Sequence, residues 1–365
     1  MKRVAVGLSG GVDSSVAAAL LVQAGHAVLG AAMKTWDGRP SATGTGRHGC
    51  YGPGEEADIA DAARVAAHLG IPFHILDLSR EFTSEVLADF SRQYRSGLTP
   101  NPCVRCNRYV KFGLIPARLK AAGIPFDAFA TGHYATIDTD PLRARHILKR
   151  GADRRKDQSY FLYLLTQDQL SSTIFPLGDR TKSEVRRIAR DLGLPVAERP
   201  ESQDFYEGRH ADLFEQPARP GPILSPDGEI LGQHRGIHRY TIGQRRGLGA
   251  HRAPLYVLDI DPGRDAVIAG PEDRLMTAEL TAGSLNWIAF ETLTAPIQVK
   301  AQIRYRHVAS DAVVLPRDDA RVDVRFSAPQ RAVTPGQAVV FYDGDAVLGG
   351  GTIERRATGG IPPDF

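Results

Sequence analysis

The sequence predicts an α/β protein in which a doubly wound parallel sheet is followed by two small β-rich modules. In the first half, apolar runs that suit buried strands alternate with stretches of helical periodicity, as in strands joined by crossover helices. Beyond Pro200 the pattern changes to short alternating strands separated by glycine and proline turns. With 365 residues, of which 42% are hydrophobic, the chain is long enough for two or three cores.

Strand–helix units open the chain. Each consists of an apolar run and the helix after it: residues 4–8 with 14–24, residues 26–33 with 55–69, and residues 71–78 with 80–94. Gly25 and Gly70 follow the first two helices as stop signals. Next we expect a cysteine-bearing turn, a helix that ends at Gly123 and a short strand within 127–135.

A capping box and several later segments complete the expected elements. Thr181 and Glu184 have the spacing of a capping box ahead of a helix that Gly193 ends. The strands of the two β modules are expected in residues 220–232, 239–249, 254–264, 266–270, 293–297, 322–329 and 337–351.

The chain has three cysteines, an odd number, and two of them form a C-x-x-C. This usage argues against a secreted disulfide framework and favours metal or thiol chemistry in a reducing compartment. The sequence has no stretch with the pattern of a secretion signal and no run of about 18 apolar residues. We therefore expect a cytoplasmic protein with no membrane partner.

Basic residues are concentrated in three stretches, although the formal net charge is only +3. Residues 233–258 contain no acid, and further basic runs cover 143–156 and 300–307. Single runs of this kind are usually solvated faces. Three of them together favour a phosphate-rich macromolecule as partner.

The segment Ser9–Ser15, SGGVDSS, lies between the first strand and the first helix. There, consecutive backbone N–H groups converge on an anion at the positive end of the helix dipole, and glycines permit its close approach. A Walker A loop would add a lysine for the β and γ phosphates, and that lysine is absent. The loop therefore suits pyrophosphate as a leaving group, with chemistry at the α phosphate; the alternative is a merely tight turn.

The C-x-x-C lies within Asn101–Asn107. A thiol on a turn entering a helix has its thiolate stabilised by the helix dipole and by nearby cations, here Arg105, Arg108 and Lys111. Such a cysteine is a nucleophile near neutral pH. A zinc site would need a second ligand pair at suitable spacing, which the sequence does not have, and a buried inert pair is the structural alternative.

The SGGVDSS loop resembles that of the PP-loop adenylating family, which cleaves ATP to AMP and pyrophosphate while activating a carbonyl oxygen. The resemblance implies ATP and Mg²⁺ as cofactors, with Asp13 helping to place the metal and the phosphates. The residues implied for nucleotide binding are Gly7, Leu8, Ser9, Gly10, Gly11, Val12, Asp13, Ser14, Met33 and Gly132. Met33 ends the second strand, where an adenine could rest, and Gly132 lies at a strand end, a normal ligand position in open α/β sheets.

A wider set of motifs runs along essentially the whole chain: TPNPCVRCN with KFG, ATGHYA, KDQSYFLYLL, ESQDF, YTIGQRRGLG, RYRH and VTPGQAVVFY. Together these motifs resemble the tRNA-specific 2-thiouridylase family. The resemblance implies ATP-dependent replacement of O2 by sulfur on the wobble uridine of certain tRNAs. It also implies a PP-loop catalytic domain over residues 1–202, a small central tRNA-contacting domain over 203–274 and a C-terminal β-barrel over 275–365.

The same resemblance implies roles for individual residues. Cys106 carries the transferred sulfur as a persulfide, and Asn101, Pro102 and Cys103 line the pocket for the extruded base. Further tRNA contacts fall on His133, Lys156, Asp157, Gln158, Arg304, Tyr305 and Gln337. From the residues alone, Lys156 can also be a solvated charge and Tyr305 a packing aromatic.

One position departs from the family pattern. In most relatives a second cysteine follows ESQD by two residues, and Tyr206 stands there in this chain. Either Cys103 takes the resolving role, or the sulfur arrives another way. If Cys50 converges with Cys103 and Cys106, three thiolates are enough for a [4Fe-4S] cluster with one iron free to bind hydrosulfide. A sulfur-donor protein or a sulfide source is an expected partner.

Other functions fit parts of the sequence. A different PP-loop enzyme, either one that thiolates another tRNA base or an amidating ligase, would use the same loop; a ligase leaves the C-x-x-C unexplained. A non-catalytic RNA-binding protein with a vestigial nucleotide site would account for the basic runs. The intact SGGVDSS loop argues against that last function.

Overall fold

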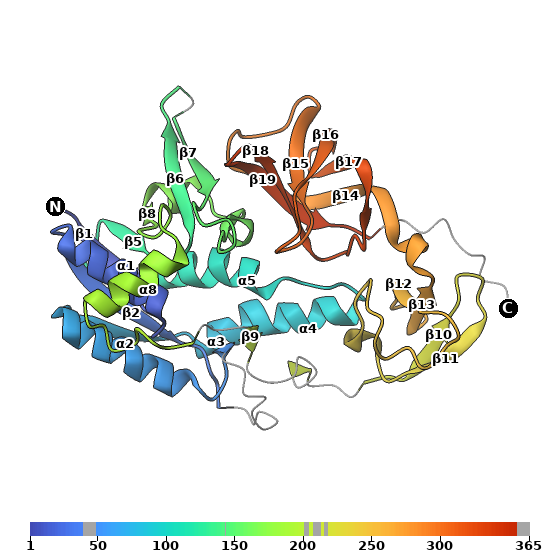
Figure 1. Ribbon diagram of the computed structural model, residues 1–365, viewed down its shortest axis with the longest axis horizontal. Helices are drawn as coiled ribbons and strands as arrows, with labels where there is room; N and C mark the ends of the chain where they lie inside the picture. Colours follow the sequence, from blue (N-terminus) through green and yellow to red (C-terminus); the bar gives the residue numbers. More distant parts are fainter. Residues whose placement is uncertain (39–48, 143, 201–203, 207–212, 215–217, 356–365) are drawn as a thin grey trace.

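The computed structural model describes residues 1–38, 49–142, 144–200, 204–206, 213–214 and 218–355. In Figure 1 the blue to green segments form an α/β part, the orange and red segments a barrel, and the yellow segments a small sheet. The boundary expected at residues 202–203 lies outside the described residues.

The α/β part is built on a five-stranded sheet in the order β4–β2–β1–β5–β8, in which every adjacent pair is parallel. Its strands are β1 (Arg3–Gly7), β2 (Ala27–Lys34), β4 (Phe73–Asp77), β5 (Ala128–Ala130) and β8 (Thr173–Ile174). The chain winds outward from β1 to one edge and then from β5 to the other. The predicted doubly wound sheet is therefore confirmed, with its switch point at the carboxyl ends of β1 and β5.

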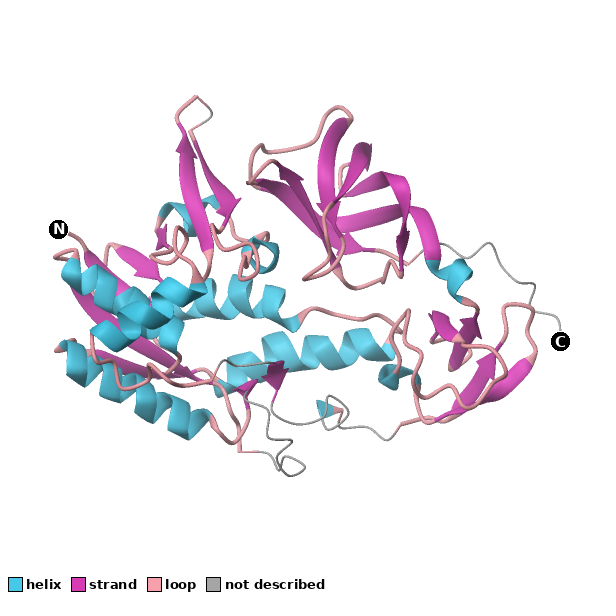
Figure 2. Cartoon of the chain, viewed as in Figure 1, coloured by secondary structure: helices cyan, strands magenta, loops and turns pink. Residues whose placement is uncertain are grey.

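Helices cover both faces of this sheet, which is why the central strand β1 is apolar and buried over residues 4–6. On one face, α1 (Val12–Gln23) and α2 (Glu55–Leu69) share a core with β1, and α8 (Lys182–Asp191) packs on α1. Two long helical stretches lie beside each other on the opposite face (Figure 2). They consist of α3 (Ser79–Phe82), η1 (Thr83–Leu87) and α4 (Ala88–Arg95), and of α5 (Pro102–Arg105), η2 (Cys106–Leu114) and α6 (Ile115–Ala121).

The two cysteines of the C-x-x-C lie inside the second of these stretches, so their expected placement on a turn ahead of the helix is wrong. Asn101 is the N-cap, with its Oδ1 accepting from the Val104 N–H at 3.4 Å, and Pro102 takes the first helical position. Cys103 therefore belongs to the first turn and Cys106 to the second.

The expected strand over residues 239–249 is also wrong. Gly243, Gly247 and Gly249 adopt φ angles of 84°, 88° and 93°, a region that a strand does not use. Tyr240 closes this loop by donating its O–H to the Gly247 carbonyl at 2.8 Å. At residues 293–297, only the last residue is in a strand.

The small sheet has four strands in the order β11–β10–β13–β12. They are β10 (Gly221–Leu224), β11 (Ile230–His234), β12 (Tyr256–Asp261) and β13 (Ala266–Gly270). Ile223, Val257 and Val267 lie in its core. Short 3₁₀ turns at Ile237–Arg239 and Glu272–Leu275 flank the sheet.

The C-terminal region is a closed antiparallel barrel, as predicted. Its order is β14–β17–β16–β15–β18–β19, and the pairing of β14 with β19 closes it. The strands are β14 (Met276–Trp287), β15 (Ile297–Gln302), β16 (Ser310–Asp318), β17 (Arg321–Arg331), β18 (Ala338–Asp343) and β19 (Ala346–Ile353). Val314, Val324 and Phe341 are among its buried residues.

A hairpin of β6 (Ala135–Asp140) and β7 (Arg145–Arg150) projects from the α/β part beside the barrel (Figure 1). One bridge between Lys149 and Ala346 joins the hairpin to β19. The 3₁₀ turn η3 (Ser159–Leu162) and the short helix α7 (Gln167–Ser171) follow it.

The segment between α4 and α5 is tied to both β modules. Thr99 donates its N–H to the Pro335 carbonyl at 2.9 Å and accepts from the Gln337 side chain at 2.8 Å. Its hydroxyl lies 3.3 Å from that of Thr241, and Arg355 donates to the carbonyl of Gly97 at 3.1 Å. This segment leads directly into the cysteine helix.

None of the helices in the described part of the chain is both long enough and apolar enough to cross a membrane.

Candidate active site

The loop after β1 presents an open row of backbone donors at the start of α1. Gly10 adopts a φ of 71°, and Gly11 is an N-cap without a side-chain cap. The hydroxyls of Ser14 and Ser15 donate to the Gly11 carbonyl at 3.1 and 2.8 Å, which fixes the turn. Within the described residues, the N–H groups of residues 10–14 donate to no acceptor. Free N–H groups at a helix N-terminus fit a phosphate group.

Two glycines let separate segments meet at this loop. A Cβ at Gly10 would lie 2.2 Å from the Asp58 carbonyl oxygen, and a Cβ at Gly132 would lie 2.6 Å from the Ser14 nitrogen. Gly132 follows β5, so its contact with α1 joins the two strands of the switch point. Met33 lies near the carboxyl end of β2 and packs against the core, and its contact with adenine stays a prediction.

A lysine from a distant element supplies the cation that the loop lacks. Lys182 is the first residue of α8, and its Nζ lies 2.7 and 2.8 Å from the two carboxylate oxygens of Asp13. Tyr134 donates its O–H to the same carboxylate at 2.8 Å. The predicted capping box at Thr181 and Glu184 is confirmed, and it fixes where α8 begins. The sequence analysis did not predict a role for Lys182. The only sign of one was its position directly after Thr181, the first residue of that capping box.

Arg199 holds the loop from its carbonyl side. Its guanidinium donates to the Gly10 carbonyl at 3.0 Å and forms ion pairs with Asp58 and Asp61 of α2. The Arg199 side chain is 18% exposed, so these pairs are shielded from solvent. The loop is thereby anchored to α2 while its N–H groups stay open.

The thiol end of the site differs from what the sequence predicted. Burial raises the pKa of the Cys106 thiol to about 11; the Lys111 charge opposes this rise, and Cys50 adds to it. Of the three cations expected to stabilise the thiolate, only Lys111 lowers the pKa of Cys106, and burial outweighs it, so the expected low pKa is wrong. Arg105 pairs with Glu85 at 3.0 Å, and Arg108 packs against the Tyr109 ring.

Tyr206, at the position of the missing cysteine, is a packing residue. The short strands β3 (Gly49–Tyr51) and β9 (Asp204–Tyr206) pair in parallel, with Tyr51 opposite Tyr206. Both rings are buried and their centroids lie 5.9 Å apart. Cys50 lies in the middle of β3 and is exposed. The pairing of β3 with β9 therefore brings Cys50 beside β9, the strand that has Tyr206 in place of a cysteine.

The three thiols lie near one lysine. Burial by itself would lower the pKa of Lys111, but the charges of Cys106, Cys50 and Cys103 raise it above its usual value. In the part of the chain that the structure describes, no group of three or more His, Cys, Asp or Glu side chains is arranged to hold a metal ion. The predicted [4Fe-4S] ligands Cys50, Cys103 and Cys106 do not fit, because a cluster needs converging thiolates, whereas burial raises the pKa of the Cys106 thiol and the half-buried Lys111 ammonium acts on all three cysteines.

His133 connects the two ends of the site. It follows Gly132, its Nδ1 lies 2.7 Å from the Thr131 hydroxyl, and its ring centroid lies 5.7 Å from that of Phe112. Burial and then the Lys111 charge hold the pKa of His133 well below its usual value, so the imidazole is neutral. Gly132 thus contacts α1, and His133 beside it faces Phe112 of the η2 segment that carries Cys106 and Lys111, so residues 132–133 link the phosphate loop to the cysteine helix.

Several predicted tRNA contacts make hydrogen bonds within the protein. Asp157 is 7% exposed and accepts from Arg150 at 2.9 Å and from the Gly151 N–H at 3.1 Å. Gln158 accepts from the Tyr134 N–H at 3.0 Å, and Gln337 holds Thr99 as described above. These side chains shape the loops around the site, and their contacts with tRNA stay predictions.

The remaining predicted tRNA contacts lie in the loop after β15 and in the loop after β7. Tyr305 stacks obliquely on Phe161 with centroids 4.4 Å apart, and Arg304 donates to the Arg331 carbonyl at 3.0 Å. Lys156 is half-buried in the loop after β7.

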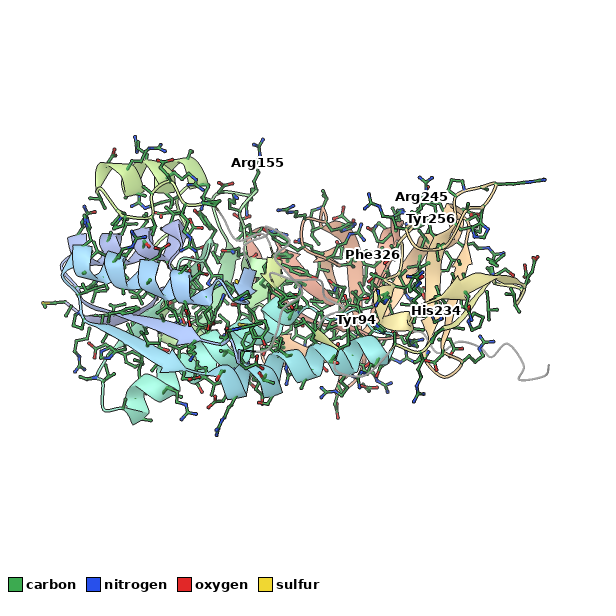
Figure 3. The ribbon with its side chains drawn as sticks, turned by 90° about the horizontal axis from the view of Figure 1, so that it is seen from below. Tyr94, Arg155, His234, Arg245, Tyr256 and Phe326 are labelled. Carbon is green, nitrogen blue, oxygen red and sulfur yellow. The ribbon has the colours of Figure 1, made fainter. Side chains whose placement is uncertain are left out.

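The small sheet and the loop after β7 both expose arginines. Within the described residues, six of these exposed arginines form no ion pair with an acid. They are Arg155, Arg235, Arg239, Arg245, Arg246 and Arg252. Figure 3 shows Arg155 and Arg245 projecting from the same side of the molecule in that view. Unpaired guanidinium groups on one side suit a polyanion.

Known proteins match the chain along nearly all of its length. Residues 2–206 match the family described as the tRNA methyl transferase HUP domain, residues 214–271 the tRNA methyl transferase PRC-barrel domain, and residues 277–353 the aminomethyltransferase β-barrel domain. The chain is 48% identical over 364 residues to the tRNA-specific 2-thiouridylase MnmA of Geotalea uraniireducens, which covers 97% of this chain and 95% of the relative. It is 46% identical over 355 residues to the protein of the same name from Endomicrobium trichonymphae, with 96% and 98% covered.

Proposed function

This chain belongs to the tRNA-specific 2-thiouridylase family, and on that premise we propose that it replaces O2 of a tRNA wobble uridine by sulfur at the cost of ATP. The observation that carries the proposal is the link from the open phosphate loop through Gly132 and His133 to the η2 segment that carries Cys106. It joins an adenylating end and a thiol end in one site.

The phosphate end activates the uridine. A pyrimidine C2 oxygen is a poor leaving group, so its attack on the α phosphate of ATP makes AMP the group that is later expelled. The open N–H groups of residues 10–14 hold the departing pyrophosphate, and Lys182 balances its charge. Asp13 is the carboxylate that would hold Mg²⁺, which when bound neutralises phosphate charge.

The thiol end supplies the sulfur. The terminal sulfur of a Cys106 persulfide forms a bond to C2, the bond between C2 and the adenylated oxygen breaks, and AMP leaves with the electron pair. The Cys103 thiolate then attacks Sγ of Cys106, which releases 2-thiouridine and leaves a disulfide between the two cysteines. An external thiol reductant returns both to thiols. The helical i, i+3 spacing of Cys103 and Cys106 supports this assignment of the resolving role.

The tRNA lies across the exposed arginines of the small sheet and of the loop after β7, with its wobble base extruded toward Cys106. Asn101 and Pro102, at the start of the cysteine helix, line the entrance for this base. A sulfur-donor protein renews the persulfide between turnovers by passing the outer sulfur of its own persulfide to the Cys106 thiolate. Free sulfide renews it by another route: it attacks the disulfide before reduction, which leaves a persulfide on Cys106 and a thiol on Cys103.

The test uses unmodified tRNA, ATP and a persulfide donor with the full-length protein. We expect 2-thiouridine at the wobble position, with AMP and pyrophosphate formed only when tRNA is present. Mass analysis of the nucleosides separates this product from a methylated base, which would favour the transfer named in the family's description. AMP formation without tRNA and with ammonia uptake would indicate an amidating ligase, and tRNA binding without any AMP would indicate a non-catalytic protein.

A further inference from the structure

The helix that carries Cys106 changes from α-helical to π-helical hydrogen bonding at that residue. Its η2 segment, Cys106–Leu114, has π-helical hydrogen bonds, which join residue i to residue i+5. In an α-helix five residues turn the chain by about 500°, which would place Lys111 about 140° around the axis from Cys106. The π-helical register instead returns Lys111 toward the face of Cys106. Such turns are rare and frequently occur at functional sites.

The charges that act on Lys111 belong to cysteines and not to acidic side chains. The thiols of Cys50, Cys103 and Cys106 all interact with its charge, and so does the neutral ring of His133. In the described part of the chain no carboxylate pairs with Lys111, whereas Arg105 of the same helix pairs with Glu85. A half-buried ammonium without a counter-ion is costly, and this cost marks a place where an anion binds.

We propose that Lys111 is a catalytic residue that holds the transferring sulfur as an anion beside Cys106 while this sulfur attacks C2. The inference rests on the proposed function. The sulfur anion forms the bond to C2, the bond from C2 to the adenylated oxygen breaks, and AMP leaves with the electron pair. Lys111 keeps its proton throughout, and its charge offsets the burial that disfavours an anion in this pocket.

The experiment compares Lys111→Met with Lys120→Met in the full-length protein. Lys120 is an exposed lysine on the same helical stretch, with its Nζ 5.6 Å from the Phe126 ring centroid and away from the thiols. Two readouts are followed with tRNA and ATP: the burst of pyrophosphate, which reports adenylation, and single-turnover sulfur transfer. Lys111→Met should keep the wild-type burst and slow sulfur transfer by about 10²-fold, while Lys120→Met changes neither.

A second variant keeps the test valid if the methionine variant folds poorly. Lys111→Arg retains the charge but moves its centre, and we expect sulfur transfer within about tenfold of wild type. Sulfur is supplied in separate reactions as a preloaded persulfide and as sodium sulfide; a defect in either reaction supports the inference and identifies the source of the anion.

Two results would overturn the inference. Wild-type sulfur transfer in folded Lys111→Met would show that the charge is not needed, and an equal loss of the pyrophosphate burst would assign Lys111 to adenylation instead. A wild-type protein without any burst would refute the proposed function itself, so the two failures are distinguishable.

Discussion

The phosphate end of the site, at residues 9–15, and its thiol end, at Cys103 and Cys106, differ in how well they accommodate a negative charge. At the phosphate end the N–H groups of residues 10–14 are open, and the Lys182 and Asp13 side chains are 12% and 32% exposed. At the thiol end burial raises the pKa of Cys106 to about 11, and Lys111 alone opposes the rise. One end has several donors ready for an anion before its ligand arrives, whereas at the other end burial disfavours an anion and the Lys111 charge is the one group that offsets it.

This difference indicates where each half-reaction is controlled. Backbone donors bind phosphate whatever else is present, so adenylation depends on several groups that share the charge. Sulfur transfer depends on single side chains, of which Cys106 and Lys111 are partly buried. Variants at the thiol end should therefore separate the two half-reactions, while variants at the phosphate end should reduce both.

The largest expected effect is that of Cys106→Ser. Because the hydroxyl cannot carry a persulfide, sulfur transfer should fall by more than about 10³-fold while the pyrophosphate burst persists. Cys50→Ser is the matched control, since Cys50 is an exposed thiol whose charge also acts on Lys111, and it should retain activity within a few-fold. Nucleoside mass analysis checks both variants. An equal loss in Cys50→Ser would contradict the role assigned to Cys103.

The second effect belongs to the phosphate end. Lys182→Met removes the cation beside Asp13, so both pyrophosphate release and sulfur transfer should slow by about 10²-fold. Arg187→Met, on the exposed side of the same helix, is the control and should change neither rate. A pyrophosphate burst that Lys182→Met leaves intact would remove this lysine from the adenylation step.

The third effect is a pH dependence of the thiol end. In a Cys50→Ser, Cys103→Ser protein, alkylation of Cys106 should accelerate about tenfold per pH unit up to about pH 10, because the pKa of this thiol is raised from 9.0 to about 11. The raised pKa also means that the folded state binds the proton more tightly than the unfolded state. Stability from this group is complete below pH 9 and is lost as the pH rises toward 11. A plateau in alkylation at pH 8 would contradict the burial argument.

The smallest effect is on tRNA binding. A variant at an exposed arginine should weaken this binding without changing either end of the site. Arg245→Ala should weaken tRNA binding by a few-fold and lower the slope of log K against log salt by about one, without a change in ATP affinity. Arg264→Ala is the control, because that guanidinium is 2.7 Å from Asp261 and already paired. Filter binding at several salt concentrations measures both. Equal slopes for the two variants would place the tRNA elsewhere.

The phosphate end was largely predictable from sequence because its signals are local. The SGG turn, the helix after it and the glycines at helix ends act through neighbouring residues, and Gly25 and Gly70 adopt the positive φ expected of helix ends. The cation at this end was not predictable, since Lys182 meets Asp13 across 169 positions of the chain.

The thiol end was harder to predict because its properties come from packing. A π-helical register has no sequence signal of its own, so the approach of Lys111 to Cys106 could not be read from their spacing. The pKa of Cys106 was predicted in the wrong direction, because the sequence shows the nearby cations but not Glu85, which engages Arg105, or the burial of the thiol. Tyr206 was seen as a missing cysteine, and its role in packing on Tyr51 needed the pairing of β3 with β9.

The tether at Thr99 has a consequence for how this chain can be divided. Thr99 and Pro100, which precede the cap of the cysteine helix, are hydrogen-bonded to Pro335 and Gln337 beside the barrel strands. The Thr99 hydroxyl also lies within hydrogen-bond distance of Thr241 in the small β module. A fragment that ends after the α/β part would keep every nucleotide ligand named here yet lose the scaffold that orients its cysteines. The three parts of the chain match separate domain families, but we expect that sulfur transfer requires all three parts together.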